Sequence, residues 1–307
     1  MTEEKKVLRK SFNFIAIVLI VYNILFDEVI FWASEAVYYF AGKVFTGMDN
    51  DALVDYVYFS GHSLIAAAVI SVAAAFLMCR EKPSFKVNRR IDFKTVISLF
   101  LIMQAIQAIC SILLYPIMGI IYMFGGSTEE AIAAASSPSV YFSSLVYSIV
   151  IAPLFEELFI RGLILNKLKP YGKGFAVIIS ALIFGFIHIN IVQFPVTFIL
   201  GILFGVIALE YSLGAAILLH MLNNIYVEFM GNLYYVSYFA DIINIIIVII
   251  SLIALGVLFV LNRERLKAYA HTLKPEKETV KAFFTAPLVI AAIVYFAVLT
   301  TGSITPL

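Results

Sequence analysis

The stretch Phe155-Glu156-Glu157-Leu158-Phe159-Ile160-Arg161 places three ionisable side chains inside a long apolar segment. The residues before it, Val140–Pro153, carry no charge, and those after it are largely apolar until Lys167. If this segment is a membrane helix, Glu156 lies about 16 Å from Lys167 along the helix axis. Ionised side chains at such a depth are energetically unfavourable and usually face a polar cavity. The stretch therefore predicts a membrane helix with a functional acid.

The two acids differ in their expected partners. Arg161 follows Glu157 by four residues, so the two side chains share one face of a helix and neutralise each other. This pair is interpreted as structural support. Glu156 lies about 100° around the helix and has no cation near it in the sequence, so it is free for chemistry.

The composition indicates a polytopic membrane protein. Of the 307 residues, 63% are hydrophobic and only 13% are charged, whereas soluble domains carry about 25% charged residues. Cys79 and Cys110 lie in apolar segments without paired spacing, so neither a disulfide framework nor a thiolate metal site is predicted. The basic start leads into an apolar run without a small-residue cleavage site, which predicts a retained signal-anchor helix. We expect no nucleic-acid partner.

The predicted fold is an all-α integral membrane bundle of eight to nine transmembrane helices in a single domain, residues 1–307. Apolar windows of about twenty residues mark each span. The first has two readings, a short span or a long or broken helix extended to Val44. The windows are Ser11–Phe26, Ser60–Cys79, Phe93–Phe124, Ser139–Leu165, Gly174–Ile189, Val192–Leu209, Leu213–Met230, Phe239–Leu261 and Ala282–Thr300.

The charges between these windows predict the orientation. Basic residues gather at the N-terminus and in Arg80–Arg90, Lys167–Lys173 and Arg263–Lys281, while the intervening loops are acidic or neutral. Because excess Lys and Arg stays on the cytoplasmic side, the N-terminus is predicted to be cytoplasmic and the C-terminus external. An odd number of spans satisfies every loop.

Further polar residues occur at matching depth on other spans. His188, His220 and Asn224 are expected near the middle of the bilayer, at the level of Glu156, and His220 and Asn224 share one helix face. Each has a structural alternative, because a membrane histidine can bind a backbone carbonyl and an asparagine can join two helices. Their coincidence on three helices favours a functional site.

Two other features have simpler interpretations. Gly201 and Gly205 form a Gly-x-x-x-Gly face, which predicts close helix packing. Asp27 and Glu28 interrupt the first apolar run and are interpreted as a helix break or an interfacial segment, with a cavity-lining role as the alternative.

Three ordered motifs carry a resemblance to a known family. Glu156-Glu157-x-x-x-Arg161, Phe184-x-x-x-His188 and His220-x-x-x-Asn224 resemble, in this order, the motifs of the CPBP intramembrane proteases, also called the CAAX-processing or Abi family. The resemblance covers a motif core at about residues 139–231. It implies a catalytic core of four helices, and eight spans are commonly described for this family.

The resemblance implies an endopeptidase that hydrolyses peptide bonds of membrane-associated peptides or proteins. Glu156 and His188 correspond to the residues taken to activate water, and His220 and Asn224 to those taken to hold the oxyanion. These residue types suit the roles, because a carboxylate and an imidazole can accept a proton from water, and N–H groups can stabilise an oxyanion.

The sequence leaves the cofactor open between none and zinc. Glu156, His188 and His220 together would also suit a catalytic zinc ion, in a metalloprotease reading. Asn224 is a poor zinc ligand and no compact zinc motif is present, which slightly favours the metal-independent mechanism.

A second class of function also fits the composition, namely a non-catalytic transporter or a bacteriocin-immunity protein that binds a peptide. Transporters place polar groups at the membrane midplane, but they commonly contain inverted repeats, and we find none here. The expected partners are a membrane-associated substrate and the lipid bilayer, and the oligomeric state is not predicted. The compact, Ile-rich chain is typical of a bacterial cell-membrane protein.

Overall fold

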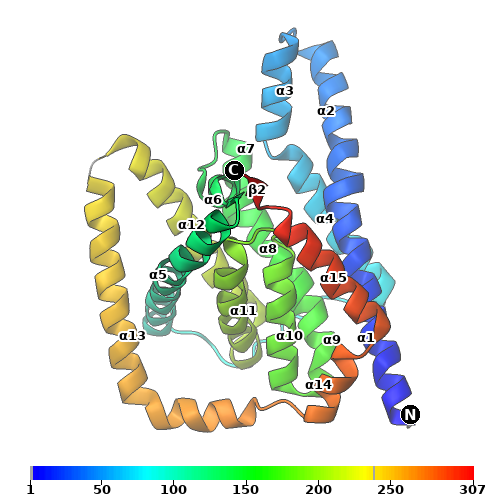
Figure 1. Cartoon of the computed structure of the whole chain (residues 1–307), viewed down its shortest axis with the longest axis vertical. Coiled ribbons are helices and arrows are strands. Elements are labelled where there is room, and N and C mark those ends of the chain that lie inside the picture. Colours follow the sequence, from blue (N-terminus) through cyan, green and yellow to red (C-terminus); the bar gives the residue numbers. More distant parts are fainter. Residues whose placement is uncertain (1–2, 238) are drawn as a thin grey trace.

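In the computed structural model the chain is almost entirely helical (Figure 1). The structure describes residues 3–237 and 239–307. Two short strands, β1 (Gly126–Ser127) and β2 (Thr305–Pro306), pair in antiparallel orientation. The all-α fold class is confirmed. The α-helices are α1 (Glu3–Asn23), α2 (Phe31–Phe45), α3 (Asn50–Phe59), α4 (His62–Cys79), α5 (Phe93–Met123), α6 (Glu129–Ser136), α7 (Phe142–Val146), α8 (Ala152–Glu157), α9 (Asn166–Leu168), α10 (Lys173–Phe186), α11 (Gln193–Glu210), α12 (Leu213–Val236), α13 (Phe239–Thr272), α14 (Lys277–Phe284) and α15 (Pro287–Thr301).

Three π-helical stretches join some of these helices without a break, and a short 3₁₀ turn follows α9. The π stretches are η1 (Ile24–Ile30), η2 (Tyr147–Ile151) and η3 (Leu158–Leu165), and the 3₁₀ turn is η4 (Lys169–Tyr171). The first helix runs through η1, so Lys5–Phe45 forms one apolar candidate span. One interpretation of the sequence expected Asp27 and Glu28 to break the helix, and this is wrong because the helix continues through both residues. Both residues lie within the π stretch η1.

The segment Phe142–Leu168, called the motif helix below, comprises α7, η2, α8, η3 and α9. The backbone is right-handed helical at each junction, so these pieces form one continuous helix. Pro153 lacks a backbone donor and its ring collides with the preceding helical turn, and the π stretch η2 directly precedes it. Glu156 and Glu157 thus lie between two π stretches.

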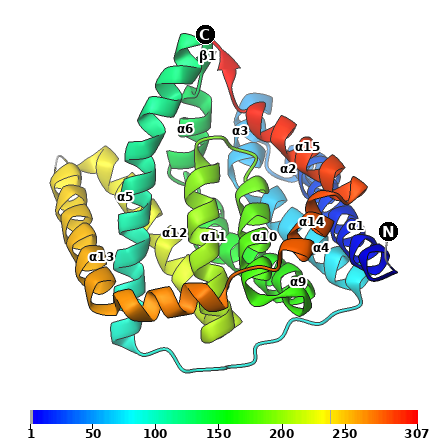
Figure 2. The same cartoon turned by 60° about the horizontal axis from the view of Figure 1, so that its bottom comes forward.

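Helices α10 and α11 pack closely at the centre of the bundle (Figure 2). A Cβ atom at Gly201 would lie 3.0 Å from Cα of Ala181, and one at Gly205 would lie 3.3 Å from Cγ1 of Val177. The two glycines therefore let the backbones approach, as the Gly-x-x-x-Gly face predicts.

The first helix is anchored to the motif helix by aromatic side chains. The rings of Tyr22 and Phe159 stack with centroids 3.9 Å apart, and both side chains are buried. Phe12 packs edge-on against Phe283 of α14 at 5.3 Å. The buried core therefore joins α1, the motif helix and the C-terminal helices.

Six helices among the described residues are long and apolar enough to cross a membrane, or seven if the bent pair α14 and α15 is one span. This establishes a multi-pass membrane protein, but the predicted eight to nine spans are not confirmed. Helix α10 is too short for that criterion. Its 14 residues extend about 21 Å, against a hydrocarbon core of about 30 Å. The predicted helix Gly174–Ile189 is therefore too long, since α10 ends at Phe186 and His188 lies in the following turn.

The basic segments gather at one end of the molecule. In Figure 1 the N-terminus and the connection between α13 and α14 lie at the bottom, while the connection between α2 and α3 lies at the top. Lys5 forms an ion pair with Glu278 at 3.5 Å, and Lys167 forms one with Glu81 at 2.7 Å. The C-terminus lies towards the opposite end, where β2 pairs with β1.

Candidate active site

Consecutive acids at the end of α8 point to different surroundings. Glu157 is completely buried, whereas the side chain of Glu156 is 23% exposed and lines a cavity. This divergence follows from the rotation of about 100° per residue in an α-helix. One carboxylate is therefore held in the protein core and the other faces open space.

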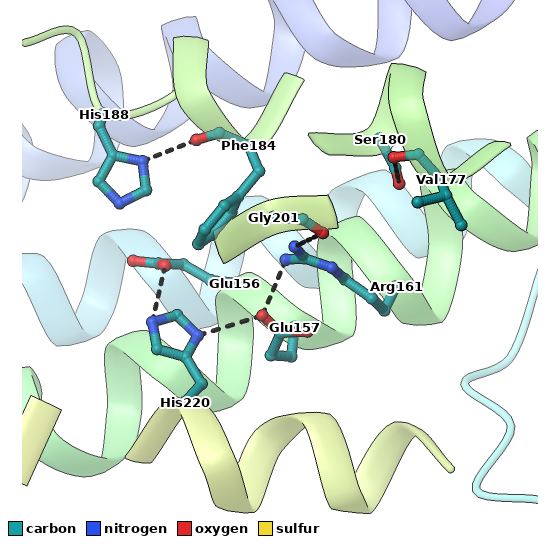
Figure 3. Close-up of polar contacts among 9 residues, drawn as sticks. All are labelled: Glu156, Glu157, Arg161, Val177, Ser180, Phe184, His188, Gly201 and His220. Atoms are coloured by element: carbon teal, nitrogen blue, oxygen red, sulfur yellow. Dashed lines mark hydrogen bonds and ion pairs between the residues drawn. The ribbon is translucent and has the colours of Figure 1, made fainter. Parts of the chain in front are cut away.

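Glu157 is neutralised within the core by its partner on the same helix. Arg161 Nη1 donates to Glu157 Oε1 at 2.8 Å, and Arg161 Nη2 donates to the carbonyl oxygen of Gly201 at 2.9 Å (Figure 3). The guanidinium also lies over the ring of Phe184, 4.3 Å from its centroid. Such a pair offsets the desolvation of both charges only when its remaining donors and acceptors are well placed. The fork of Arg161 connects the motif helix to α10 and α11.

His220 on α12 joins the two acids. Its Nδ1 lies 3.1 Å from Glu157 Oε1, and its Nε2 lies 3.8 Å from Glu156 Oε2. The imidazole stacks on the ring of Phe204, with centroids 4.9 Å apart and planes 20° apart. Since a carboxylate only accepts hydrogen bonds, Nδ1 carries the proton in this contact. Nε2 is thereby aimed at Glu156.

His188 lies in the turn after α10, and its orientation is also fixed. Its Nδ1 lies 2.7 Å from the carbonyl oxygen of Phe184, and its ring meets that of Phe184 edge-on with centroids 4.9 Å apart. A carbonyl oxygen only accepts, so Nδ1 donates, and in the neutral ring Nε2 keeps its lone pair. The residue is thus prepared to accept a proton at Nε2.

Asn224 lies one turn after His220 on α12. Its Nδ2 donates to the carbonyl oxygen of Ser148 in η2, at 2.9 Å. An amide nitrogen carries two hydrogens, so one N–H remains for a further acceptor. The π stretch thus fixes the amide beside the motif helix.

One cavity of about 480 Å³ brings the predicted residues together. It is lined by Glu156, His188, His220 and Asn224, which come from the motif helix, the turn after α10, and α12. Figure 3 shows the Glu156 carboxylate between the two imidazoles. Oε2 of Glu156 is buried and has no hydrogen-bond partner among the described residues. The nearest charged partner of this oxygen is Nε2 of His220 at 3.8 Å, so Glu156 keeps acceptor positions free in the shared cavity.

Other polar side chains also line this cavity. Gln107 Nε2 donates to Asn223 Oδ1 at 3.1 Å, and both residues line the cavity. Glu228 lines it as well, but its two oxygens accept from the backbone N–H and the hydroxyl of Ser139. Each oxygen of Glu228 therefore has a hydrogen-bond partner, whereas Oε2 of Glu156 has none among the described residues.

The three candidate zinc ligands are not gathered into a metal-binding cluster in the described part of the chain. Across residues 3–237 and 239–307, no group of three His, Cys, Asp or Glu side chains is placed to hold a metal ion. The Nδ1 atoms of His188 and His220 are occupied by a carbonyl and a carboxylate, which leaves only their Nε2 atoms as ligands. Engagement of Nδ1 by a carbonyl or a carboxylate is also usual for zinc-binding histidines, so these contacts do not distinguish the two mechanisms.

Comparison with known families identifies the segment that carries this site. Residues 138–226 match the family described as type II CAAX prenyl endopeptidase Rce1-like. This segment is similar to the Rce1-like family. The resemblance that the three motifs indicate is thereby confirmed, and all four cavity residues proposed for chemistry lie within the matched segment. Comparison with curated proteins and with solved structures gives no match.

Two contacts within the matched segment could not be predicted from the sequence. Phe204, which stacks on His220, gave no signal beyond its place on an apolar helix. The contact of Glu157 with His220 was also missed, because the pair with Arg161 explained Glu157 completely. The sequence signal for this contact was the presence of a histidine motif at the same depth as Glu157, in addition to Arg161.

Proposed function

We propose that this protein is an intramembrane endopeptidase that hydrolyses peptide bonds of membrane-associated peptides or proteins. The observation that carries the proposal is that Oε2 of Glu156 accepts no hydrogen bond from the described residues, in the cavity that His188, His220 and Asn224 also line. The match to endopeptidases of the CAAX type supports the reaction class. Specificity for a prenyl group or for a particular sequence is not part of the proposal.

In the proposed reaction, Glu156 and His188 activate a water molecule. The water oxygen bonds to the scissile carbonyl carbon while the carboxylate of Glu156 accepts a proton from the water. The carbonyl oxygen thereby becomes an oxyanion. Collapse of this intermediate breaks the C–N bond, and the proton passes from Glu156 to the leaving amine. The products are a carboxyl group and an amine. His188 supports the step by accepting a hydrogen bond from the water at Nε2.

His220 and Asn224 are proposed to stabilise the oxyanion. His220 already donates from Nδ1 to Glu157, so donation from Nε2 requires the doubly protonated imidazolium. Asn224 contributes the N–H of its amide that does not contact Ser148. Loss of one oxyanion donor typically lowers kcat by about a hundredfold to a thousandfold.

The cavity has the size expected for a peptide segment. Its volume of about 480 Å³ falls within the range of about 300–1,000 Å³ typical of ligand pockets. The side-chain amides of Gln107 and Asn223, which line the same cavity, offer donors and acceptors for a substrate backbone. The cavity volume and these amide groups support a peptide substrate.

A metal-independent mechanism is proposed for this site. It rests on the side-chain amide of Asn224, which is a weak metal ligand, and on the described residues, among which no three His, Cys, Asp or Glu side chains are placed to hold a metal ion. Activity measured with a chelator, together with metal analysis of the same active sample, tests this part separately.

We further propose eight to nine membrane crossings, with the N-terminus in the cytoplasm of a bacterial cell. Six or seven helices are candidate spans by length and composition. Adding the motif helix and α10 gives eight or nine. The basic segments share one end of the molecule, as the positive-inside rule requires. The four-helix catalytic core consists of the motif helix, α10, α11 and α12.

The function is tested with purified protein in vesicles and a library of membrane-anchored peptides, with products identified by mass spectrometry. Cleavage by the unaltered protein and its loss in Glu156→Gln and His188→Ala support the proposal. Glu129→Gln, which changes an exposed acid on α6, is the matched control. Cleavage that survives both site variants contradicts the assignment. Peptide binding or transport without any cleavage supports the non-catalytic alternative.

A further inference from the structure

Glu156 and His188 line a second cavity as well as the large one. This second cavity has a volume of about 120 Å³, and Asn23 and Asp27 of the first helix lie in its wall. Tyr147 and Ala152 of the motif helix border both cavities. The proposed catalytic pair therefore separates a space of peptide size from a smaller polar space.

The small cavity is suited to water. One water molecule needs only about 10–15 Å³ by this measure and two to four polar partners. Asp27, Asn23, Glu156 and His188 supply such partners, whereas a peptide would not fit in the same volume.

Asp27 is held in place by neighbours on two helices. Asn23 Nδ2 donates to Asp27 Oδ2, and the hydroxyl of Tyr295 on α15 donates to Asn23 Oδ1 at 2.7 Å. This is the only side-chain hydrogen bond of Asp27 among the described residues. A carboxylate has about four acceptor positions, so most of its capacity remains for the cavity.

The backbone is widened on both sides of this space. Asp27 lies in the π stretch η1, and Tyr147 begins the π stretch η2 of the motif helix. Single π turns within α-helices are frequent at functional sites. The stacking of Tyr22 on Phe159 holds the two helices together next to the cavity. An acid inside an apolar span is itself a functional signal.

We propose that the small cavity supplies the hydrolytic water, and that Asp27 is a positioning residue that orders this water against Glu156 and His188. The inference rests on the proposed protease function. When a peptide fills the large cavity, water cannot approach Glu156 from that side, and the small cavity provides the other approach. While the water waits in the small cavity, Asp27 accepts one of its two hydrogens. As the water attacks, that hydrogen turns to Nε2 of His188 and Glu156 removes the other, so Asp27 takes no proton in the reaction.

The first test separates kcat from KM in anchored-peptide cleavage by Asp27→Asn. Because Asp27 lines only the small cavity, we expect an unchanged KM and a kcat lowered about tenfold to a hundredfold, as for a misplaced reactant. Asp27→Glu, which keeps the carboxylate, should retain more activity than Asp27→Asn. Glu28→Gln changes the exposed neighbouring acid and should match the unaltered protein.

The second test fills the cavity without changing a polar group. Ala68 of α4 is buried and lines the small cavity only, so Ala68→Leu should lower kcat and leave KM unchanged. Ala135 lines the large cavity only, so Ala135→Leu should raise KM instead. Thermal unfolding in detergent identifies any variant that loses its fold, and the remaining variants then decide the question.

Glu156→Gln in the same assay distinguishes the two proposals. If Glu156→Gln is inactive while Asp27→Asn and Ala68→Leu keep the kcat of the unaltered protein, the water-supply inference is wrong and the protease function stands. A raised KM at unchanged kcat in Asp27→Asn also contradicts the inference, because it places Asp27 in substrate binding. If Glu156→Gln cleaves as fast as the unaltered protein, both proposals fail.

Discussion

Glu157 holds His220 through a single oxygen, since Oε1 lies 3.1 Å from Nδ1 of His220 and also accepts from Arg161. The second acid of the motif is therefore more than a partner for Arg161. It fixes which nitrogen of His220 is available to the cavity. Because all three side chains are buried, a change at one of them should affect the other two.

Glu157→Gln should reduce both stability and activity. The change keeps the shape of the side chain but leaves the buried Arg161 without its counter-charge, and breaking a buried pair in this way costs about 3–5 kcal/mol. His220 should also lose its fixed orientation. Thermal unfolding and peptide cleavage measured on the same preparation check this. A fully stable variant with normal kcat would show that the contact with His220 has no role.

Arg161→Lys should not be a conservative change. A lysine ammonium cannot reach Glu157 and the Gly201 carbonyl with the same fork geometry, and it loses the flat contact with Phe184. We expect a lower unfolding temperature and reduced yield of folded protein. Lys167→Arg, at a partly exposed pair with Glu81, is the control and should behave like the unaltered protein.

Gly201→Ala should destabilise the packing of α10 against α11. The new methyl group would lie 3.0 Å from Cα of Ala181, which is backbone and cannot move away easily. Overpacking of this kind costs about 1–3 kcal/mol. Gly256→Ala on α13 is the matched control, because the added methyl meets nothing within 4 Å among the described residues. Unfolding temperatures that fall equally in both variants would contradict the packing account.

Asn224→Ala should lower kcat and leave KM nearly unchanged. The amide is proposed to act only on the oxyanion, so its loss should reduce the rate about a hundredfold or more. The lost hydrogen bond to Ser148 should have a smaller effect on stability, about 1 kcal/mol. Steady-state kinetics with an anchored peptide separate the two parameters. A rise in KM alone would place Asn224 in substrate binding.

Cleavage should continue when metal ions are removed. The proposed route uses the Glu156 carboxylate and no metal-bound water, so a strong chelator should leave kcat unchanged. Activity and metal content are measured on the same sample, and zinc is then added back. Loss of activity on chelation and recovery with zinc would favour the metalloprotease alternative.

The sequence predicted which polar residues lie close together, because charge within an apolar span is a strong signal. Hydropathy gives depth along a helix axis, and four polar residues on three predicted spans were assigned matching depths. The structure places Glu156, His188, His220 and Asn224 in one cavity. The roles of these residues in chemistry remain predictions.

Rotation about the helix axes could not be predicted in the same way. The π stretches change the angle between successive turns, and nothing in the period of the apolar residues marked η2 or η3. The end of α10 before His188 could not be predicted, because Ile187 and Ile189 continue the apolar pattern. In the structure Ile189 adopts a positive φ of 49°, which an α-helix does not allow. The aromatic contact between Phe204 and His220 depends on packing between helices, which one sequence does not record.

The most direct measurement is the single-turnover rate of peptide cleavage by Glu156→Gln relative to the unaltered protein, with peptide binding measured in parallel. A general base contributes about a hundredfold to ten-thousandfold to the rate. The account predicts a loss of this size with peptide binding retained, because the amide keeps the shape of the side chain but cannot accept the proton of water. A rate within a few-fold of the unaltered protein would contradict it.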